Sequence, residues 1–340
     1  MVSVVRAIDV GYGMTKYVLQ SAGTGKFTCG SFPSLVALGS GRQLGAGYFD
    51  ERDTVVVEWQ GQSYEVGTDV TLALRGHNTR VLDPSYIRSD DYHILIRGAL
   101  KKMGLSRLDL LVLGAPLLNF DQVSATLQSS FTGIIDLDSK ERVEVCRVVV
   151  LPQPVGGLGW AGSLAAASGA SREITERTLM IDVGYFTVDW LVAEGTRVLP
   201  ERSGSYPGGM SSLIRELANE VSRRTGEDIT TMAMWDKIDR YLYAREKFTI
   251  YGKEYDLSQH AQIVKSTVSQ SVAALAQRIG DAKDISQILL VGGGAKRFAE
   301  SVQELYPSMS VSIVADAPFA NVKGFQLIGE AMSDKQLAVR

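Results

Sequence analysis

A five-residue motif occurs twice in this chain and constrains its fold more than any other feature. Ile-Asp-Val-Gly-Tyr stands at residues 8–12 and again at 181–185. Each copy follows an apolar run and precedes a β-rich segment, the pattern of a buried strand that turns back into a second strand. The alternative is that two unrelated hairpins share these residues by chance. However, the copies stand near the starts of the two halves of the 340-residue chain. We therefore predict two lobes built alike.

The segments around the two copies predict the same succession of strands. We expect strands at 4–9, 15–21 and 27–32 around the first copy, and at 178–182, 187–193 and 196–200 around the second. Further strands are expected at 59–66, 110–114 and 287–291. Helices are expected at 92–103 with Asp90 and Asp91 as caps, at a segment starting from Asp121, at 155–167, at a segment capped by Ser211, and at 259–279. Residues 333–340 are expected to form a frayed tail. Alternating strands and helices are typical of α/β folds.

Composition and charge exclude several classes of protein. With 45% hydrophobic and 21% charged residues, the chain is long enough for two large lobes with buried cores. The net charge of −3 gives no broad attraction to nucleic acid or anionic membrane. Cys29 and Cys146 lie far apart, which predicts neither a zinc site nor a disulfide. Without a signal peptide or an apolar run approaching the ~20 residues of a membrane helix, we expect a soluble, cytoplasmic protein.

The first copy of the motif opens a turn that suits a polyphosphate. Gly11 and Gly13 let backbone N–H groups approach phosphate oxygens, with Tyr12 between them. Lys16 can neutralise phosphate charge, and Asp9 can hold the hydration shell of Mg²⁺. A plain hairpin with glycine at positive φ explains the same residues, so both interpretations stay open.

The second copy offers a similar turn. Asp182 is another candidate for binding metal or orienting water, and Gly184, Tyr185 and Thr187 are candidates for contacting the nucleotide. Two such loops would grip one phosphate chain from both sides. A plain hairpin is again the alternative.

A glycine triplet at 292–294 follows the expected strand at 287–291. It would let the backbone pass close to a nucleoside, and the helix N-terminus behind it favours an anion, although a tight strand-to-helix turn is the simpler explanation. The candidate nucleotide-binding residues of the second half are Gly184, Tyr185, Thr187, Gly208, Gly209, Gly292, Gly293, Gly294, Lys296 and Arg297.

Gln153 stands between two prolines, before the small-residue helix expected at 155–167. A glutamine amide both donates and accepts hydrogen bonds, so it can orient an attacking water in phosphoryl transfer. Capping of a turn is the alternative role. The histidines at 77, 93 and 260 are scattered without a metal-binding pattern, and His93 is expected on a helix surface.

Taken in order, these segments resemble the ATPase superfamily of actin, sugar kinases and heat-shock chaperones. Asp9, Gly11, Gly13 and Lys16 match the first phosphate loop of actin in spacing. Leu-Val-Gly-Gly-Gly-Ala at 290–295 resembles the adenosine motif of ParM, and Ala-Pro-Phe-Ala-Asn-Val-Lys-Gly-Phe at 317–325 resembles the start of the last helix in ParM and its StbA relatives. The similarity is therefore greatest to the plasmid-segregation actins.

This resemblance implies an α/β fold of duplicated actin/ribonuclease H-like domains that form two lobes around a nucleotide cleft. The first lobe would span 1–160, with a small subdomain inserted at about 33–88 that includes the Gly-rich stretch 39–47. The second would span 161–340, with a helical subdomain at about 211–285 and a last helix at about 319–332 returning to the first lobe.

The resemblance also implies a chemistry. It places Mg-ATP, or Mg-GTP, in the cleft, with Asp9 and Asp182 near the metal and Gln153 or Asp182 positioning the lytic water. Three positions depart from the family pattern: Tyr12 replaces a serine of actin, Tyr185 and Phe186 replace smaller residues, and Gln153 replaces a frequent glutamate.

Proteins of this type join head to tail into open filaments. In plasmid systems such filaments separate DNA copies through an adaptor that binds the centromere, which fits a chain expected to make no direct contact with nucleic acid or membrane. The alternatives are a sugar or small-acid kinase, an MreB-like cytoskeletal actin, and a nucleotide-dependent binding module that does not polymerise.

Overall fold

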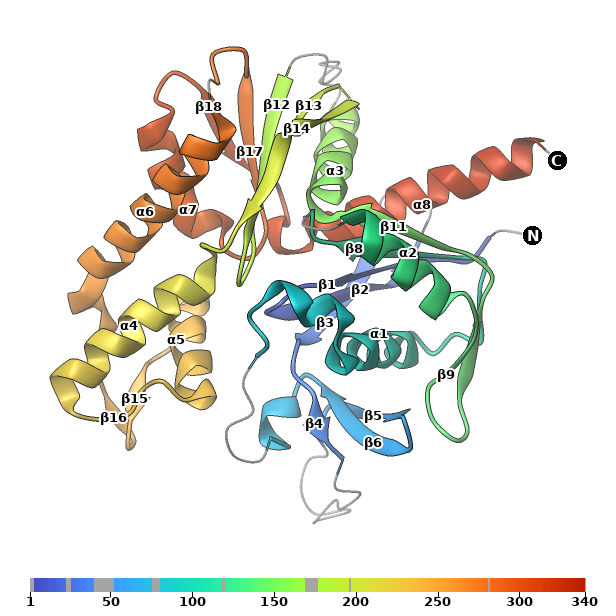
Figure 1. Cartoon of the computed structure of the whole chain (residues 1–340), viewed down its shortest axis with the longest axis horizontal. Helices are drawn as coiled ribbons and strands as arrows, with labels where there is room; N and C mark the ends of the chain where they lie inside the picture. The colour runs from blue at the N-terminus through green and yellow to red at the C-terminus, as the bar shows by residue number, and fades with distance from the viewer. Residues whose placement is uncertain are drawn as a thin grey trace. The chain divides into compact units, whose positions relative to one another are not determined.

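The computed structural model describes residues 3–22, 26–39, 52–74, 80–117, 120–168, 177–195, 197–280 and 282–339. The chain divides into two compact units: unit 1 comprises 1–173 with 319–340, and unit 2 comprises 174–318 (Figure 1). Most of the Gly-rich stretch 39–47, and His77, lie outside the described residues.

Unit 1 is built on a five-stranded mixed sheet. Its strands are β1 (Val5–Val10), β2 (Met14–Ser21), β3 (Phe27–Pro33), β8 (Leu110–Ala115) and β11 (Val148–Pro152), in the order β11-β8-β1-β2-β3. The first three strands form an antiparallel meander, and β8 and β11 are added parallel to β1. The carboxyl ends of β1, β8 and β11 therefore meet at one edge of the sheet.

Unit 2 repeats this plan. Its strands are β12 (Arg177–Val183), β13 (Val188–Glu194), β14 (Arg197–Tyr206), β17 (Gln287–Val291) and β18 (Ser310–Ile313), in the order β14-β13-β12-β17-β18. Again the first three strands are antiparallel neighbours, and the last two are parallel to the first. The duplicated α/β architecture predicted from the repeated motif is confirmed.

In the described part of unit 1, four α-helices accompany the sheet: α1 (Asp90–Met103), α2 (Phe120–Phe131), α3 (Gln153–Ala167) and α8 (Ala320–Val339). Successive residues of a strand face opposite sides of the sheet. Ile8 accordingly joins the core formed with α1 and α2, and Ala7 packs with Phe325 of α8. Figure 1 shows α8, in red, alongside β1, in blue, so both ends of the chain belong to unit 1.

Helices α3 and α8 approach each other through glycines. A Cβ atom on Gly324 would lie 1.7 Å from the carbonyl oxygen of Gly156. Because no side chain fits in that space, the two backbones are in direct contact. Helix α8 also continues to Val339, so the expected frayed tail from residue 333 is wrong.

The described residues of unit 1 also form two small sheets. One contains β4 (Ala37–Leu38), β5 (Thr54–Trp59) and β6 (Gln62–Gly67), and the other β7 (Arg107–Leu108), β9 (Gly133–Asp136) and β10 (Arg142–Val145). A strand was expected at 59–66: β6 covers 62–66 of this range, and the expected start is wrong because Trp59 ends β5. Gln60 and Gly61 have φ values of 50° and 77°, which form the tight turn of a β5–β6 hairpin. The 3₁₀ helices η1 (Val70–Leu72) and η2 (Pro84–Arg88) follow.

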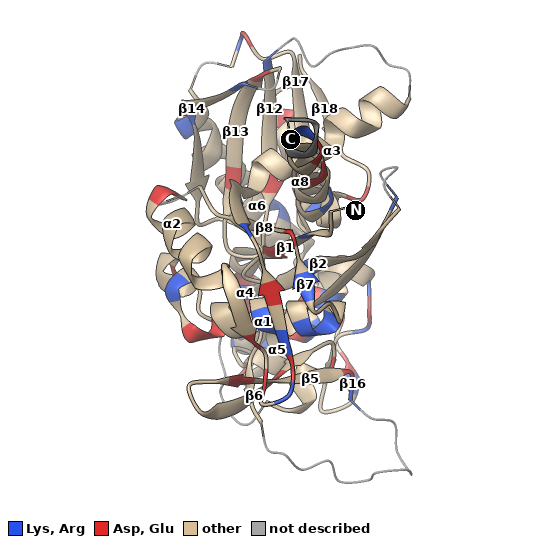
Figure 2. Cartoon of the chain, turned by 90° about the vertical axis from the view of Figure 1, so that its right-hand side faces the viewer, with Lys and Arg blue, Asp and Glu red and all other residues tan. Residues whose placement is uncertain are grey.

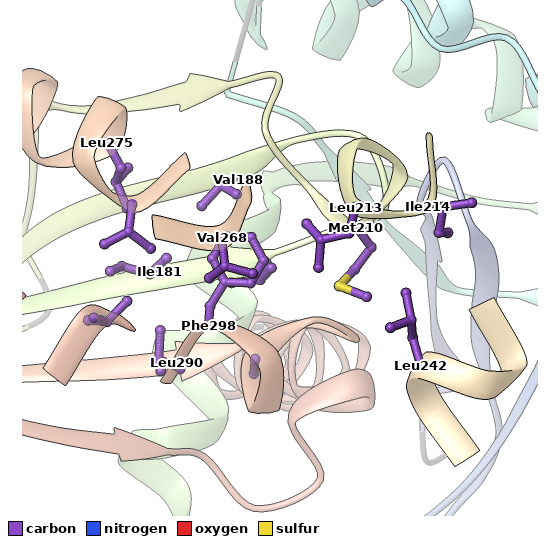
Figure 3. Packing of buried hydrophobic residues seen from close by; sticks show 14 of the residues in the cluster. Ile181, Val188, Met210, Leu213, Ile214, Leu242, Val268, Leu275, Leu290 and Phe298 are labelled. Atoms are coloured by element: carbon purple, nitrogen blue, oxygen red, sulfur yellow. The ribbon is translucent and has the colours of Figure 1, made fainter. Parts of the chain in front are cut away.

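The core of unit 2 lies between its sheet and its helices α4 (Met210–Thr225), α5 (Met232–Ala244), α6 (Ala261–Ile279) and α7 (Ala295–Leu305). Figure 3 shows Ile181 and Leu290, from adjacent strands, together with Phe298 of α7 in this cluster. The short elements β15 (Thr249–Ile250), β16 (Lys253–Glu254) and η3 (Leu257–His260) lie in the same unit, and η4 (Ala317–Phe319) stands where the chain passes back to unit 1. Helix α5 was not expected, because only Ile238 and Leu242 on it are fully buried.

Several local expectations need correction. Ser89, whose hydroxyl accepts a hydrogen bond from the amide of Tyr92, caps α1 in place of Asp90 and Asp91. Gly209 stands at the N-cap of α4, so Ser211 is not its cap. His93 does not lie on an open helix surface: its ring is stacked 5.5 Å from that of Trp59 and 5.2 Å from that of Phe131.

Charged residues of both signs are interspersed over the elements in the view of Figure 2. Among the described helices, none combines the length and the apolar character needed to cross a membrane.

Candidate functional site

The carboxylate of Asp9 is buried at the end of β1, where its side chain is held from two directions. Asp9 is opposite Lys16 in the β1–β2 register, and the Lys16 Nζ lies 3.9 Å from Asp9 Oδ2. Gln153 donates a hydrogen bond of 2.8 Å from Nε2 to Asp9 Oδ1. Asp9 is only 2% exposed, so these partners offset the loss of hydration of its charge.

The sheet explains how Gln153 reaches Asp9 across 144 positions of sequence. Strand β8 lies between β1 and β11, and Gln153 is the first residue of α3, directly after β11. Gly114 of β8 provides the space for the contact, since a Cβ there would lie 2.9 Å from Asp9 Oδ1. Sequence reasoning missed Gly114, whose only signal is a glycine inside an otherwise apolar strand.

The turn from Gly11 to Gly13 is fixed by residues outside the motif. Ser34 donates from its hydroxyl to the carbonyl oxygen of Gly11 at 2.6 Å and from its amide to that of Gly13 at 2.9 Å. Arg80 donates to the same Gly13 oxygen at 3.3 Å. The turn is therefore held in shape by side chains that the motif did not predict.

Tyr12 extends from this turn onto η2. Its hydroxyl donates to the carbonyl oxygen of Asp83 at 3.1 Å, and its ring lies 5.0 Å from that of Tyr86. Tyr86 contacts Tyr92 edge to face, and the Tyr92 hydroxyl donates to the carbonyl oxygen of Gly114. Burial raises the pKa of both Tyr86 and Tyr92, so both phenols stay neutral at physiological pH.

The second hairpin carries a different pair of side chains. In the β12–β13 register Asp182 is opposite Asp189, and the two residues are 6% and 2% exposed. The amide of Gly184 closes the turn onto the carbonyl oxygen of Thr187 at 2.9 Å. The Thr187 hydroxyl donates to Asp189 Oδ2 at 2.7 Å. Sequence reasoning did not select Asp189.

The start of α4 packs onto this turn. The amide of Met210 donates to the carbonyl oxygen of Gly184 and that of Ser211 to Tyr185. A Cβ on Gly209 would lie 2.6 Å from the Gly184 oxygen, and one on Gly208 would lie 2.3 Å from the ring of Tyr206. Both glycines thus have a packing role, and these two N–H groups of α4 are already bonded within the protein.

The three glycines after β17 have different surroundings. Gly292 has a φ of +88°, and a Cβ there would lie 2.3 Å from Asp182 Oδ1. Gly294 donates to the carbonyl oxygen of Val183 at 3.0 Å, and a Cβ there would meet the Val183 side chain. Gly293 is exposed, and a Cβ on it would meet nothing within 4 Å. Only Gly293 offers open space to a ligand.

The two cations after this triplet also differ. Lys296 is exposed. Arg297 donates from its Nε to the carbonyl oxygen of Leu242 at 2.9 Å, and its Nη2 donates to the same oxygen near the end of α5. Burial, and then repulsion by Arg245, lower the pKa of Arg297. The structure thus gives the Arg297 guanidinium a structural contact, and its predicted contact with the nucleotide stays a prediction.

Comparison with known proteins matches both halves of the chain to one group. Residues 7–156 match the family "Actin like proteins N terminal domain", and residues 180–304 match "Archaeal actin homologue MreB-like, C-terminal". Both halves of the chain are thus similar to actin-like proteins. A curated relative, the archaeal actin homologue of Thermoplasma volcanium, is 26% identical over 338 residues, with 95% of this chain and 98% of that protein covered.

Solved actin-like structures share the fold over nearly the whole chain. The archaeal actin homologue Ta0583 in complex with ADP has a TM-score of 0.75 at 20% identity, covering 96% of this chain and 99% of its own. A subunit of the 15-stranded ParM filament from Clostridium botulinum has a TM-score of 0.74 at 20% identity, covering 97% and 100%. At this identity the similarity establishes the fold.

The donor set of this actin-like chain fits a hydrated Mg²⁺ bound through a nucleotide. Among the described residues, no group of three or more His, Cys, Asp and Glu side chains is placed to hold a metal. Mg²⁺ usually keeps several waters and binds through one or two carboxylates together with substrate phosphates. Buried Asp9 in unit 1 and buried Asp182 in unit 2 each supply one carboxylate. That both reach the same nucleotide stays a prediction.

Proposed function

We propose that this chain is a filament-forming actin-like ATPase that binds Mg-ATP. The observation that carries the proposal is the buried carboxylate of Asp9, held by Lys16 and Gln153 at the end of β1. An acid, a cation and an amide side chain meet there beside a glycine turn, which is the donor set that a metal-bound polyphosphate requires.

Each unit would contribute its hairpin turn to the Mg-nucleotide. Gly11, Tyr12, Gly13 and Lys16 would contact the phosphates from unit 1, and Gly184, Tyr185 and Thr187 would contact the nucleotide or its hydrated Mg²⁺ from unit 2. When bound, Mg²⁺ would neutralise the charge that develops on the transferred phosphoryl group. Asp9 and Asp182 would hold the hydrated ion through their carboxylates, and Gly293 leaves room for the nucleoside.

Gln153 has a defined hydrogen-bonding state in this site. The Gln153 amide donates from Nε2 to Asp9 Oδ1, so its Oε1 remains an acceptor. That oxygen is suited to orient the attacking water. Asp182 is the alternative for this role.

Assembly is the second part of the proposal. An actin-like subunit that joins the next one head to tail makes a contact that does not close, so it grows into a filament. The ParM filament among the related structures, and the ADP complex of an archaeal homologue, support a nucleotide-dependent filament. Separation of DNA through an adaptor protein that binds the centromere is the cellular role we infer from the similarity to ParM.

The test mixes purified protein with Mg-ATP, Mg-GTP, Mg-ADP or no nucleotide and follows light scattering and phosphate release together. We expect scattering that rises with Mg-ATP and decays as phosphate is released. An Asp9→Ala variant with unchanged unfolding temperature should bind Mg-ATP at least ~10-fold more weakly, by analogy with the loss of groups around metal sites.

The other outcomes identify the alternatives. Phosphate transfer only after addition of a sugar or small acid would indicate a kinase. Polymerisation that requires lipid vesicles would indicate an MreB-like protein. Nucleotide binding without scattering or phosphate release would indicate a binding module, and no nucleotide binding at all would refute the proposal.

A further inference from the structure

The residue opposite the motif acid differs between the two hairpins. In unit 1 Asp9 is opposite a cation, Lys16, and in unit 2 Asp182 is opposite a second acid, Asp189. Directly opposed residues of an antiparallel pair present their side chains on the same face. The second hairpin thus carries two buried acids on one face, and Thr187 of the turn is bonded to one of them.

The bond between Thr187 and Asp189 fixes the direction of the threonine hydroxyl. A hydroxyl has one proton to donate and lone pairs that accept. Thr187 donates its proton to Asp189 Oδ2 at 2.7 Å. Toward any ligand, the Thr187 oxygen is then an acceptor.

This direction determines which ligand atom Thr187 can contact. A phosphate oxygen at neutral pH is itself an acceptor, so it gains nothing from the Thr187 hydroxyl. A water bound to a divalent cation is a strong donor, because the cation polarises it. The backbone of Thr187 stays fixed in either case, since its carbonyl oxygen accepts from the amide of Gly184.

We propose that Asp189 is a positioning residue that commits Thr187 to accept a hydrogen bond from a water of the nucleotide-bound Mg²⁺. This inference rests on the proposed function, and it names a residue and a hydrogen-bond direction at the same site. Asp189 does not touch the phosphates. It acts through Thr187, in the way that outer partners orient the groups around a metal.

The test measures the Mg²⁺ concentration that gives half-maximal phosphate release at saturating ATP. Thr187→Val removes the hydroxyl at nearly constant shape, Thr187→Ser retains it, and Asp189→Asn lets the partner donate instead of accept. Thr178→Val is the matched control: Thr178 is a buried threonine at the other end of β12, bonded to Gln287. Unfolding temperature and binding of a fluorescent ATP analogue in excess EDTA are measured for every variant.

We expect Thr187→Val and Asp189→Asn to raise the half-maximal Mg²⁺ concentration by about 10- to 100-fold. Thr187→Ser and Thr178→Val should leave it within about twofold, and Mg²⁺-free nucleotide binding should change little in all four. An unchanged Mg²⁺ requirement in Thr187→Val and Asp189→Asn, with a lower unfolding temperature, would overturn the inference and leave a purely structural role. A wild-type protein that binds no nucleotide would overturn the proposed function itself.

Discussion

The two hairpins that carry the repeated motif share a backbone and differ in charge. In unit 1, Lys16 of the β1–β2 hairpin and Gln153 of α3 both contact Asp9. The β12–β13 hairpin places Asp189 opposite Asp182, and the Thr187 hydroxyl donates a hydrogen bond to Asp189. The two hairpins thus share the fold of the turn, while the residue opposite the acid is a cation in one and an acid in the other.

Giving the first hairpin the charge pattern of the second should have the largest effect. Lys16→Asp would place two buried acids on one face of β1–β2 and remove the cation proposed to bind phosphate. We expect nucleotide binding to be lost and the free energy of unfolding to fall by about 3 kcal/mol, because a buried charge loses its partner. Calorimetric titration with Mg-ATP measures the binding, and unfolding in urea measures the free energy of unfolding.

Lys16→Met separates the two contributions to that effect. It should also weaken nucleotide binding, but it adds no negative charge, so its loss of stability should be smaller. Equal affinity for Mg-ATP in the wild type and both variants would show that the first hairpin does not face the phosphates.

Changing Gln153 tests the amide that links Asp9 to the start of α3. Gln153→Ala should spare Mg-ATP binding and slow phosphate release by about 100-fold, the lower range for a group that assists proton transfer. Gln153→Glu should slow release and also weaken binding, since it replaces the donor to Asp9 with an acceptor of like charge. Single-turnover kinetics measure the hydrolysis step, and titration with Mg-ATP measures binding. An unchanged hydrolysis rate in Gln153→Ala would contradict the assigned role.

The glycine triplet of unit 2 gives a matched pair of smaller changes. Gly292→Ala should destabilise the fold by about 1–3 kcal/mol, because it adds a Cβ at positive φ against Asp182. Gly293→Ala meets open space, so stability should stay within about 0.5 kcal/mol. If the nucleoside passes over this position, Gly293→Ala should still lower nucleotide affinity. Equal affinity for Gly293→Ala and wild type would place the nucleoside elsewhere.

The smallest effect concerns one histidine in each unit. Burial, and then Arg97, lower the pKa of His93 in unit 1, and burial, and then Arg224, lower that of His260 in unit 2. The unfolded state, with a histidine pKa of about 6.5, therefore binds protons first as pH falls. The free energy of unfolding should decrease as pH drops below about 6.5.

Urea midpoints at about pH 7.5 and pH 5.5 measure this decrease. His93→Phe keeps an aromatic ring between Trp59 and Phe131, so it should reduce the pH dependence without a large loss of stability at the higher pH. A pH dependence identical to that of the wild type would exclude His93 as a contributor.

Strands and turns close to the repeated motif were predictable because their signals are local. The strand at 287–291 has the bounds that were expected, and the other strands near the two motif copies differ mainly at their ends. Where local signals were weak, prediction failed. A single strand was expected at 59–66 because the turn at Gln60 and Gly61 interrupts the β pattern only briefly, and α5 was missed because much of its surface is only partly buried.

The sequence alone determined the duplicated plan, since hydrophobic alternation and a repeated strand-turn-strand motif act over a few residues. The tertiary structure decided which side chains meet: Gln153 with Asp9, Asp189 with Thr187, and Arg297 with Leu242. These partners depend on strand order, strand register and helix packing, which bring together groups that no local pattern relates. The chemistry of the site is therefore set by contacts, whereas the plan of the fold is already present in the order of the residues.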